Sequence, residues 1–241
     1  MGPELFLYER AFEDCLDRLT IVSQRFDRAL LIGCPDPRWR LRLEGFADTV
    51  EVRDPGPLFA AAAAGTVILE DHWEPEPLAY DLVLAIGTLD TVNDLPRAMM
   101  ALRLAMKPGA MIIGAVSGGD TLPLLRAAMR EADLVTGGAS PHVHPRIEAS
   151  ALAPLLSRCG FSNPVVDVDR ARVSYGSLHK LVRDLRRMGA TNVLAQRSRT
   201  PMSRMAFAAA SASFKAAGNG EQSVETFEIL HFAGWAPSAS S

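Results

Sequence analysis

Ala29-Leu30-Leu31-Ile32-Gly33 runs directly into Cys34-Pro35-Asp36-Pro37, and this junction decides the fold class. The first segment is a short apolar run of the kind that forms a buried strand, and the two prolines of the second segment end it in a turn. Ahead of the junction, apolar residues recur at helical spacing over residues 12–26, which predicts an amphipathic helix. The chain therefore begins with a helix, a buried strand and a turn.

The same alternation of strand and helix continues along the chain. Apolar or alternating runs predict further strands at residues 49–53, 66–69, 81–86, 110–116, 164–168 and 225–232. Helical spacing predicts helices at residues 58–64, 95–106, 122–132, 149–159, 177–188 and 201–216. Strands separated by helices indicate right-handed crossovers, so we expect an α/β fold with a Rossmann-like, mainly parallel sheet. We expect one domain over residues 1–241, in which residues 177–216 form a helical insertion or lid before the last strand.

Composition and charge exclude several classes of protein. The 241 residues are 48% hydrophobic and 22% charged, which is typical of a packed domain and not of a disordered chain. With 25 Lys and Arg against 28 Asp and Glu, the formal net charge is −3, so the molecule as a whole does not attract nucleic acid or anionic lipid. Three widely spaced cysteines form neither a disulfide framework nor a zinc motif. Without a secretory signal or a long apolar run, we expect a cytoplasmic protein with no membrane insertion and no nucleic-acid partner.

Candidate site residues follow the predicted strands, because ligands of open α/β sheets bind at the carboxyl ends of the strands. Gly33 lies where nucleotide-binding folds carry several glycines, but Pro35 and Pro37 supply no N–H groups. Gly33 is therefore either a cofactor-loop residue or an ordinary turn glycine. Asp54 either accepts hydrogen bonds from ribose hydroxyls or initiates the turn at Pro55.

The next strand ends supply further acids. Glu70 and Asp71 follow the third strand, where an acid accepts from an adenine amino group or is simply solvated. Beyond the fourth strand, Asn93 or Asp94 is the expected N-cap of the next helix, whereas Asp90 has no such structural explanation.

Other chemistry-bearing residues give weaker signals. His142 and His144 have no third metal ligand at a suitable spacing, so we predict no metal site. No nucleophile turn accompanies a histidine, which disfavours a hydrolase. We interpret a late group of arginines as solvated helix faces: Arg183, Arg186, Arg187, Arg197, Arg199 and Arg204.

Several segments, in this order, carry a resemblance to one family: VNDLPRA (92–98), GGDTL (118–122), CGF (159–161), DLRRMGATN (184–192), TFEIL (226–230) and GW (234–235). Together they resemble the methyltransferase-fold family that includes the mitochondrial complex I assembly factor five and its alphaproteobacterial relatives, which are related to the biotin-synthesis malonyl methyltransferase. The resemblance covers nearly the whole chain. It implies a seven-stranded S-adenosylmethionine-type sheet, with Gly33, Asp54 and Asp71 at the positions that meet methionine, ribose and adenine. Gly87, after the fourth strand, completes the expected cofactor-binding set.

The chain departs from the family pattern inside the pocket. Leu31 replaces an acid, Pro35 and Pro37 replace two glycines, and Asp90-Thr91 replaces a His-Trp pair. The resemblance therefore implies S-adenosylmethionine as cofactor, with a site that is weakened or lost.

Two hypotheses follow from these observations. In the first, the protein transfers the sulfonium methyl group in line to an acceptor that the sequence does not identify, with Asp90 or Asp120 as general base. In the second, a noncatalytic protein keeps the fold and binds a partner, such as a respiratory complex under assembly.

Overall fold

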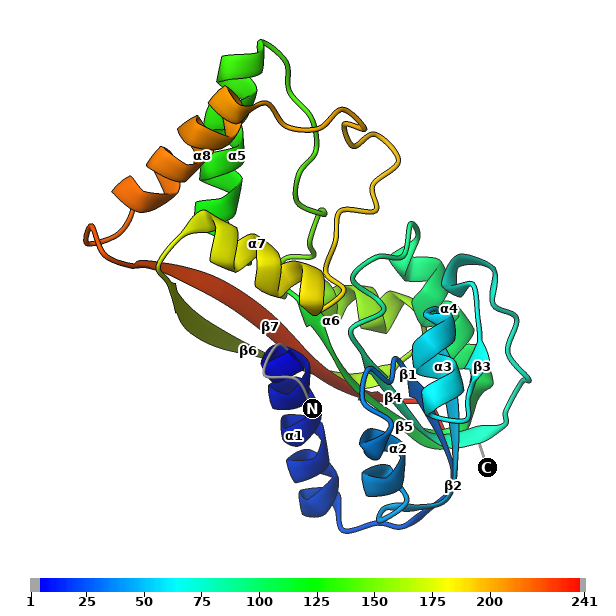
Figure 1. Ribbon diagram of the computed structural model, residues 1–241. Helices are drawn as coiled ribbons and strands as arrows, with labels where there is room; N and C mark the ends of the chain where they lie inside the picture. Colours follow the sequence, from blue (N-terminus) through cyan, green and yellow to red (C-terminus); the bar gives the residue numbers. More distant parts are fainter. Residues whose placement is uncertain (1–4, 239–241) are drawn as a thin grey trace.

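The computed structural model describes residues 5–238, which contain one seven-stranded sheet in the order β3-β2-β1-β4-β5-β7-β6 (Figure 1). The pairings among β1, β2, β3, β4 and β5 are parallel, and β7 runs antiparallel to both β5 and β6. The strands are β1 (Phe26–Ile32), β2 (Ala47–Asp54), β3 (Thr66–Val67), β4 (Tyr80–Ile86), β5 (Met106–Ser117), β6 (Ser162–Tyr175) and β7 (Ser223–Trp235). The expected Rossmann-like, mainly parallel sheet of seven strands is confirmed.

Helices cover both faces of the sheet. Phe12 of α1 and Trp39 of α2 stack with ring centroids 4.3 Å apart and anchor these helices on one face. Met99 of α4 and Leu152 of α6 pack on the other face. The helices are α1 (Phe6–Val22), α2 (Arg38–Leu43), α3 (Pro57–Ala62), α4 (Leu95–Ala105), α5 (Pro123–Thr136), α6 (Ala149–Arg158), α7 (Leu178–Arg187) and α8 (Arg204–Ala216), with a 3-10 turn, η2 (Glu70–His72).

Several boundaries differ from those the sequence predicts. The predicted first helix runs to Phe26, but Ser23 adopts a left-handed conformation that ends α1, and the buried Phe26 begins β1. Helix α2 was missed because it is short and directly follows two prolines. Strand β3 is only two residues long, whereas β6 and β7 extend well beyond their predicted ends.

A group of three helices, α5, α7 and α8, forms a helical cap beside the sheet. The long strands β6 and β7 continue out of the sheet as a two-stranded ribbon that carries this cap (Figure 1). Helices α7 and α8 lie between β6 and β7 along the chain. Cap residues such as Phe214 and Leu181 form a third hydrophobic cluster. That residues 177–216 form an insertion or lid remains a prediction.

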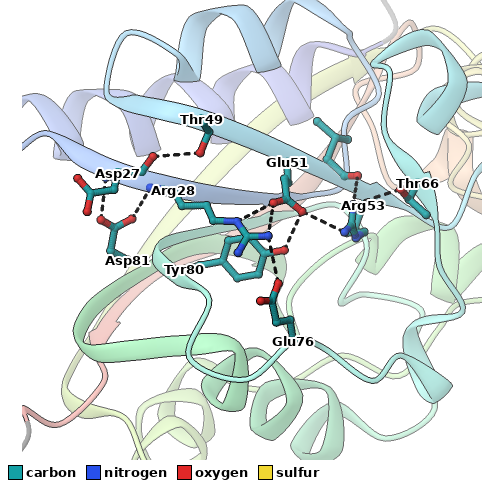
Figure 2. Close-up of polar contacts among 10 residues, drawn as sticks. Asp27, Arg28, Thr49, Glu51, Arg53, Thr66, Glu76, Tyr80 and Asp81 are labelled. Carbon is teal, nitrogen blue, oxygen red and sulfur yellow. Dashed lines mark hydrogen bonds and ion pairs between the residues drawn. The ribbon is translucent and has the colours of Figure 1, made fainter.

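Part of one sheet face is held by charge pairs instead of apolar packing (Figure 2). Glu51 on β2 accepts from Arg28 Nε on β1 at 2.7 Å, from Arg53 Nη2 at 3.0 Å and from the Tyr80 hydroxyl on β4 at 3.0 Å. Arg28 also reaches Glu76 at 3.1 Å. This polar network joins three neighbouring strands to the segment that precedes β4.

Among residues 5–238, none of the helices has the length and apolar character needed to cross a membrane. The three cysteines are free and buried.

Candidate active site

A cavity of about 360 Å³ lies at the carboxyl ends of β1, β2, β4 and β5. The N-terminal turns of α1, the cap and the loop before α6 close its other sides. Parallel strands place their carboxyl ends at one edge, so residues far apart in the sequence meet here.

Gly33 ends β1 and lines the cavity. Its φ is +84°, and a Cβ atom at this position would lie 2.0 Å from the Ile86 carbonyl oxygen. Gly33 is thus required by the close approach of β1 and β4. Pro35 also lines the cavity, so the proline-rich turn borders the space without filling it.

Asp54 ends β2, is buried, and has the turn role that was one of its two alternatives. Its carboxylate accepts from the backbone N–H groups of Cys34 and Gly56, both at 2.7 Å, and so braces both turns. Burial raises the pKa of Asp54 above its ordinary value, although these two N–H groups oppose the shift. Asp54 also lines the cavity, and a carboxylate has about four lone-pair sites, so acceptor capacity remains.

Gly87 follows β4 and contacts Tyr8 of α1. Its φ is +77°, and a Cβ atom at this position would lie 2.8 Å from Tyr8 Cε1. Only glycine therefore leaves room for the Tyr8 ring in the cavity wall. Burial, and next the charge of Asp90, raise the pKa of Tyr8 to about 12, which keeps its hydroxyl protonated. No sequence pattern points to Tyr8, because it lies on a helix that is far in the sequence from every strand end.

Asp90 also lines the cavity. Its carboxylate accepts from the Ser117 backbone N–H at 2.7 Å and pairs with Arg146 Nη1 at 3.2 Å. Arg146 was not predicted, because a single arginine in a polar loop belongs to no motif. Its Nε is buried without a hydrogen-bond partner among the described residues.

Two predicted residues lie outside the cavity wall. Asp71 accepts from the Asn93 backbone N–H at 2.9 Å and from its Nδ2 at 2.6 Å, so it braces the loop before α4. The Asp120 side chain is 68% exposed and pairs with Arg170 at 3.2 Å. Its buried neighbour Glu228 lines the cavity instead.

Two other acids that follow strand ends, Asp94 and Glu70, lie outside the wall of the main cavity. Asp94 is the N-cap of α4 and accepts from the Arg97 N–H at 2.9 Å, as expected. Glu70 lies beside a small apolar void next to Ile32 and Trp73, not in the main cavity.

Two loops are joined across the cavity mouth. His144 Nε2 accepts from the Val193 N–H at 3.1 Å, and Asn192 Nδ2 donates to the Pro141 carbonyl at 2.7 Å. His142 pairs with Asp133 at 2.8 Å. Within residues 5–238, no three His, Cys, Asp or Glu side chains are grouped so that they could hold a metal.

Comparison with known proteins gives a consistent set of relatives, although no protein-family model matches the chain. The mouse mitochondrial arginine-hydroxylase NDUFAF5 is 30% identical over 240 residues, which cover 95% of this chain and 70% of the mouse protein. The zebrafish protein of the same name is 37% identical over 161 residues, covering 66% of this chain and 50% of that protein. A malonyl-[acyl-carrier protein] O-methyltransferase of Xylella fastidiosa is 32% identical over 181 residues, or 69% of this chain and 60% of that protein. The chain spans about half the length of the zebrafish, rat and human proteins of this name.

Solved structures share the fold. The YcgJ protein of Bacillus subtilis superposes with a TM-score of 0.62 at 9% identity, over 92% of this chain and 97% of that one. A putative methyltransferase of Bacillus halodurans gives a TM-score of 0.60 at 11% identity, over 92% and 99%. Identities this low speak for the fold alone.

Proposed function

Because the chain belongs to the S-adenosylmethionine-dependent methyltransferase superfamily, in the family of mitochondrial arginine-hydroxylase NDUFAF5, we propose that it binds S-adenosylmethionine in the cavity and methylates an acceptor there. The observation that carries this proposal is the open cavity between Gly33, Asp54 and Gly87. The cavity reaches the altered turn at Pro35, so the lost glycines do not by themselves exclude a ligand.

The residues present fit the cofactor. Asp54 keeps lone pairs for ribose hydroxyls, Gly33 and Pro35 border the place of the methionine moiety, and Phe59 offers a ring for the adenine. The bound cofactor supplies an electrophilic methyl group on its sulfonium. Asp71, which the resemblance assigns to adenine, is not part of this proposal because it lies outside the cavity wall.

The chain itself positions and polarises the acceptor. Asp90 is fixed by Ser117 N–H and Arg146, so its carboxylate is placed to accept a proton or a hydrogen bond from a nucleophile in the cavity. We assign the general-base role to Asp90 and not to the exposed Asp120.

The second candidate is a noncatalytic binding protein that assists assembly of a partner, such as a respiratory complex. The contacts of Asp54 support this second candidate. Its carboxylate accepts from the N–H groups of both turns, and an acid with a purely structural role would make the same hydrogen bonds. The location remains a prediction: cytoplasmic from the sequence, whereas the NDUFAF5 relatives are named mitochondrial.

Calorimetric titration with S-adenosylmethionine and S-adenosylhomocysteine distinguishes the two candidates. We expect micromolar affinity, about −8 kcal/mol. Phe59→Ala should weaken binding about tenfold through lost ring contact. The matched control is Leu58→Ala, because Leu58 is 85% exposed and lies outside the cavity wall. If neither ligand binds measurably, the methyltransferase proposal is overturned and the noncatalytic one is left.

A further inference from the structure

The strand order divides the cavity into two halves. Gly33, Asp54 and Phe59, which we assign to the cofactor, lie at or just after the ends of β1 and β2, on one side of β4. On the other side of β4, the wall is formed by residues of β5, of β7 and of the cap. We call this second part the acceptor half, because it is the space left for the molecule that is methylated.

The wall of the acceptor half is largely apolar. Three pairs of side chains form it, from the start of α5, the end of α7 and β7: Leu122 and Leu125, Leu185 and Met188, Phe227 and Ile229. Each of the six is at most 9% exposed. Such a wall favours a ligand that buries apolar surface, and it raises the desolvation cost of a ligand that carries an unpaired charge.

The carboxylates of the acceptor half already have cationic partners. Among the described residues 5–238, three carboxylates line the whole cavity, and Asp54 is on the cofactor side. Asp90 pairs with Arg146 Nη1 at 3.2 Å, and Glu228 pairs with Arg170 Nη2 at 2.6 Å. A positively charged acceptor would therefore find no carboxylate left to balance its charge.

The basic side chains of the cavity wall are occupied as well. Arg146 is 12% exposed, and its Nη1 donates to the Asp90 carbonyl at 3.1 Å in addition to pairing with the Asp90 carboxylate. His142 pairs with Asp133 at 2.8 Å. Burial lowers the pKa of His144 below its ordinary value, so this ring is neutral near pH 7. A negatively charged acceptor would therefore meet no unpaired cation in the part of the wall that the structure describes.

We propose that the acceptor half takes an uncharged, largely apolar molecule that carries a hydroxyl group. This inference names the substrate class of the proposed methyltransferase, so it rests on the proposed function. Asp90 can receive the hydroxyl, because a carboxylate has about four lone-pair sites and the contacts with Ser117 and Arg146 do not use them all.

The transfer then needs no further reactant. The hydroxyl proton passes to Asp90 while a bond forms between the hydroxyl oxygen and the methyl carbon. The bond between that carbon and sulfur breaks, and its electron pair stays on sulfur and cancels the positive charge there. The methylated product is an uncharged ether, which the apolar wall accommodates as it does the acceptor.

Three probes of the same shape test the charge preference in the parent chain. Near pH 7, 2-naphthol is uncharged, 2-naphthoate is an anion and (2-naphthyl)methylammonium is a cation. Calorimetric titration should show that 2-naphthol binds at least about tenfold more tightly than either ion. If either ion binds as tightly as 2-naphthol, or if none of the three binds measurably, the inference is overturned.

The variant Arg170→Gln should reverse part of this preference. It removes the partner of Glu228, which is 3% exposed, so the cationic probe should bind about tenfold more tightly than it binds the parent chain. Arg170 is itself 56% exposed, so we expect the variant to fold. Arg172→Gln is the matched control, because Arg172 is exposed on the same strand and lies outside the cavity wall. Equal changes in the two variants would contradict the charge argument.

Titration with S-adenosylmethionine keeps this inference apart from the proposed function. Binding of S-adenosylmethionine without any preference for 2-naphthol would overturn the inference and leave the proposed function standing. A preference for 2-naphthol without binding of S-adenosylmethionine or S-adenosylhomocysteine would overturn the proposed function and support only the charge preference of the cavity.

Discussion

A single backbone conformation at Gly33 holds the end of β1 against β4. We predict that Gly33→Ala lowers the free energy of unfolding by about 3 kcal/mol, because a left-handed alanine is strained and the new Cβ displaces the Ile86 carbonyl. Gly137→Ala is the control, since its φ is +70° but no atom lies within 4 Å of the added Cβ. Its loss should be about 1 kcal/mol. Urea denaturation measures both, and equal losses would show that the Ile86 contact relaxes freely.

The burial of Glu70 raises the free energy of its charged form, and the nearby Thr88 side chain offsets this cost only in part. Burial raises its pKa from 4.5 to about 7, and its Oε1 has no hydrogen-bond partner among the described residues. The unfolded chain releases this proton first, so stability should fall as the pH rises from 4.5 to about 7 and then level off. Glu70→Gln should add about 1 kcal/mol near pH 8 and nothing near pH 4, a modest gain because solvent partly screens the side chain. Urea denaturation at both pH values checks this, with the exposed Glu74→Gln as control; identical pH profiles for parent and Glu70→Gln would contradict it.

The residues of the candidate site could be predicted only where a strand leads to them. Gly33, Asp54, Gly87 and Asp90 follow predicted strands, and all four line the cavity. Asp71 also follows a strand, but a short 3-10 turn carries it toward Asn93 instead. Tyr8 and Arg146 come from a helix and a loop that periodicity does not relate to the sheet edge, so only the folded chain brings them there.

At the scale of elements, the polar network around Glu51 replaces apolar packing between β1, β2 and β4 (Figure 2). We predict that Glu51→Gln lowers the free energy of unfolding by about 2 kcal/mol, because Arg53 then loses its carboxylate partner and Arg28 keeps only Glu76. Asp48→Asn breaks an exposed pair with Arg25 and should cost less than about 0.5 kcal/mol. Thermal or urea denaturation near neutral pH provides the comparison.

The same network has a defined pH dependence. Burial alone would raise the pKa of Glu51, but hydrogen bonds from Arg28 and Tyr80 outweigh it and hold the pKa below the ordinary value of 4.5. Its stabilisation is therefore present above pH 4.5 and is lost as the pH falls through the lowered pKa. Parent and Glu51→Gln stabilities should converge in acid, and a constant difference down to the lowest measurable pH would contradict this account.

Elements were predictable from sequence where their hydrophobic pattern is local. The apolar residues of β4 and the end of α4 could be predicted from the sequence, whereas the lengths of β6 and β7 could not. Outside the sheet these strands pair only with each other, and there β6 alternates exposed residues such as Arg170 and Arg172 with half-buried residues such as Ala171 and Val173. A strand of this kind is defined by its partner across the ribbon, about 60 residues away, and not by its own composition.

At the scale of the whole molecule, the cap has its own hydrophobic cluster and is joined to the sheet by the ribbon and by Leu7 and Tyr8, which pack against both. We therefore predict that the cap opens at a lower free energy than the sheet. Phe214→Ala, at a position that is 1% exposed, should cost about 3–5 kcal/mol locally and speed hydrogen exchange in α5, α7 and α8 while β1 and β4 stay protected. Phe12→Ala in the sheet cluster is the matched variant and should speed exchange in β1 and β4 as well. If Phe214→Ala speeds exchange equally in every segment, cap and sheet form one cooperative unit, and movement of the cap over the cavity would require unfolding of the whole chain.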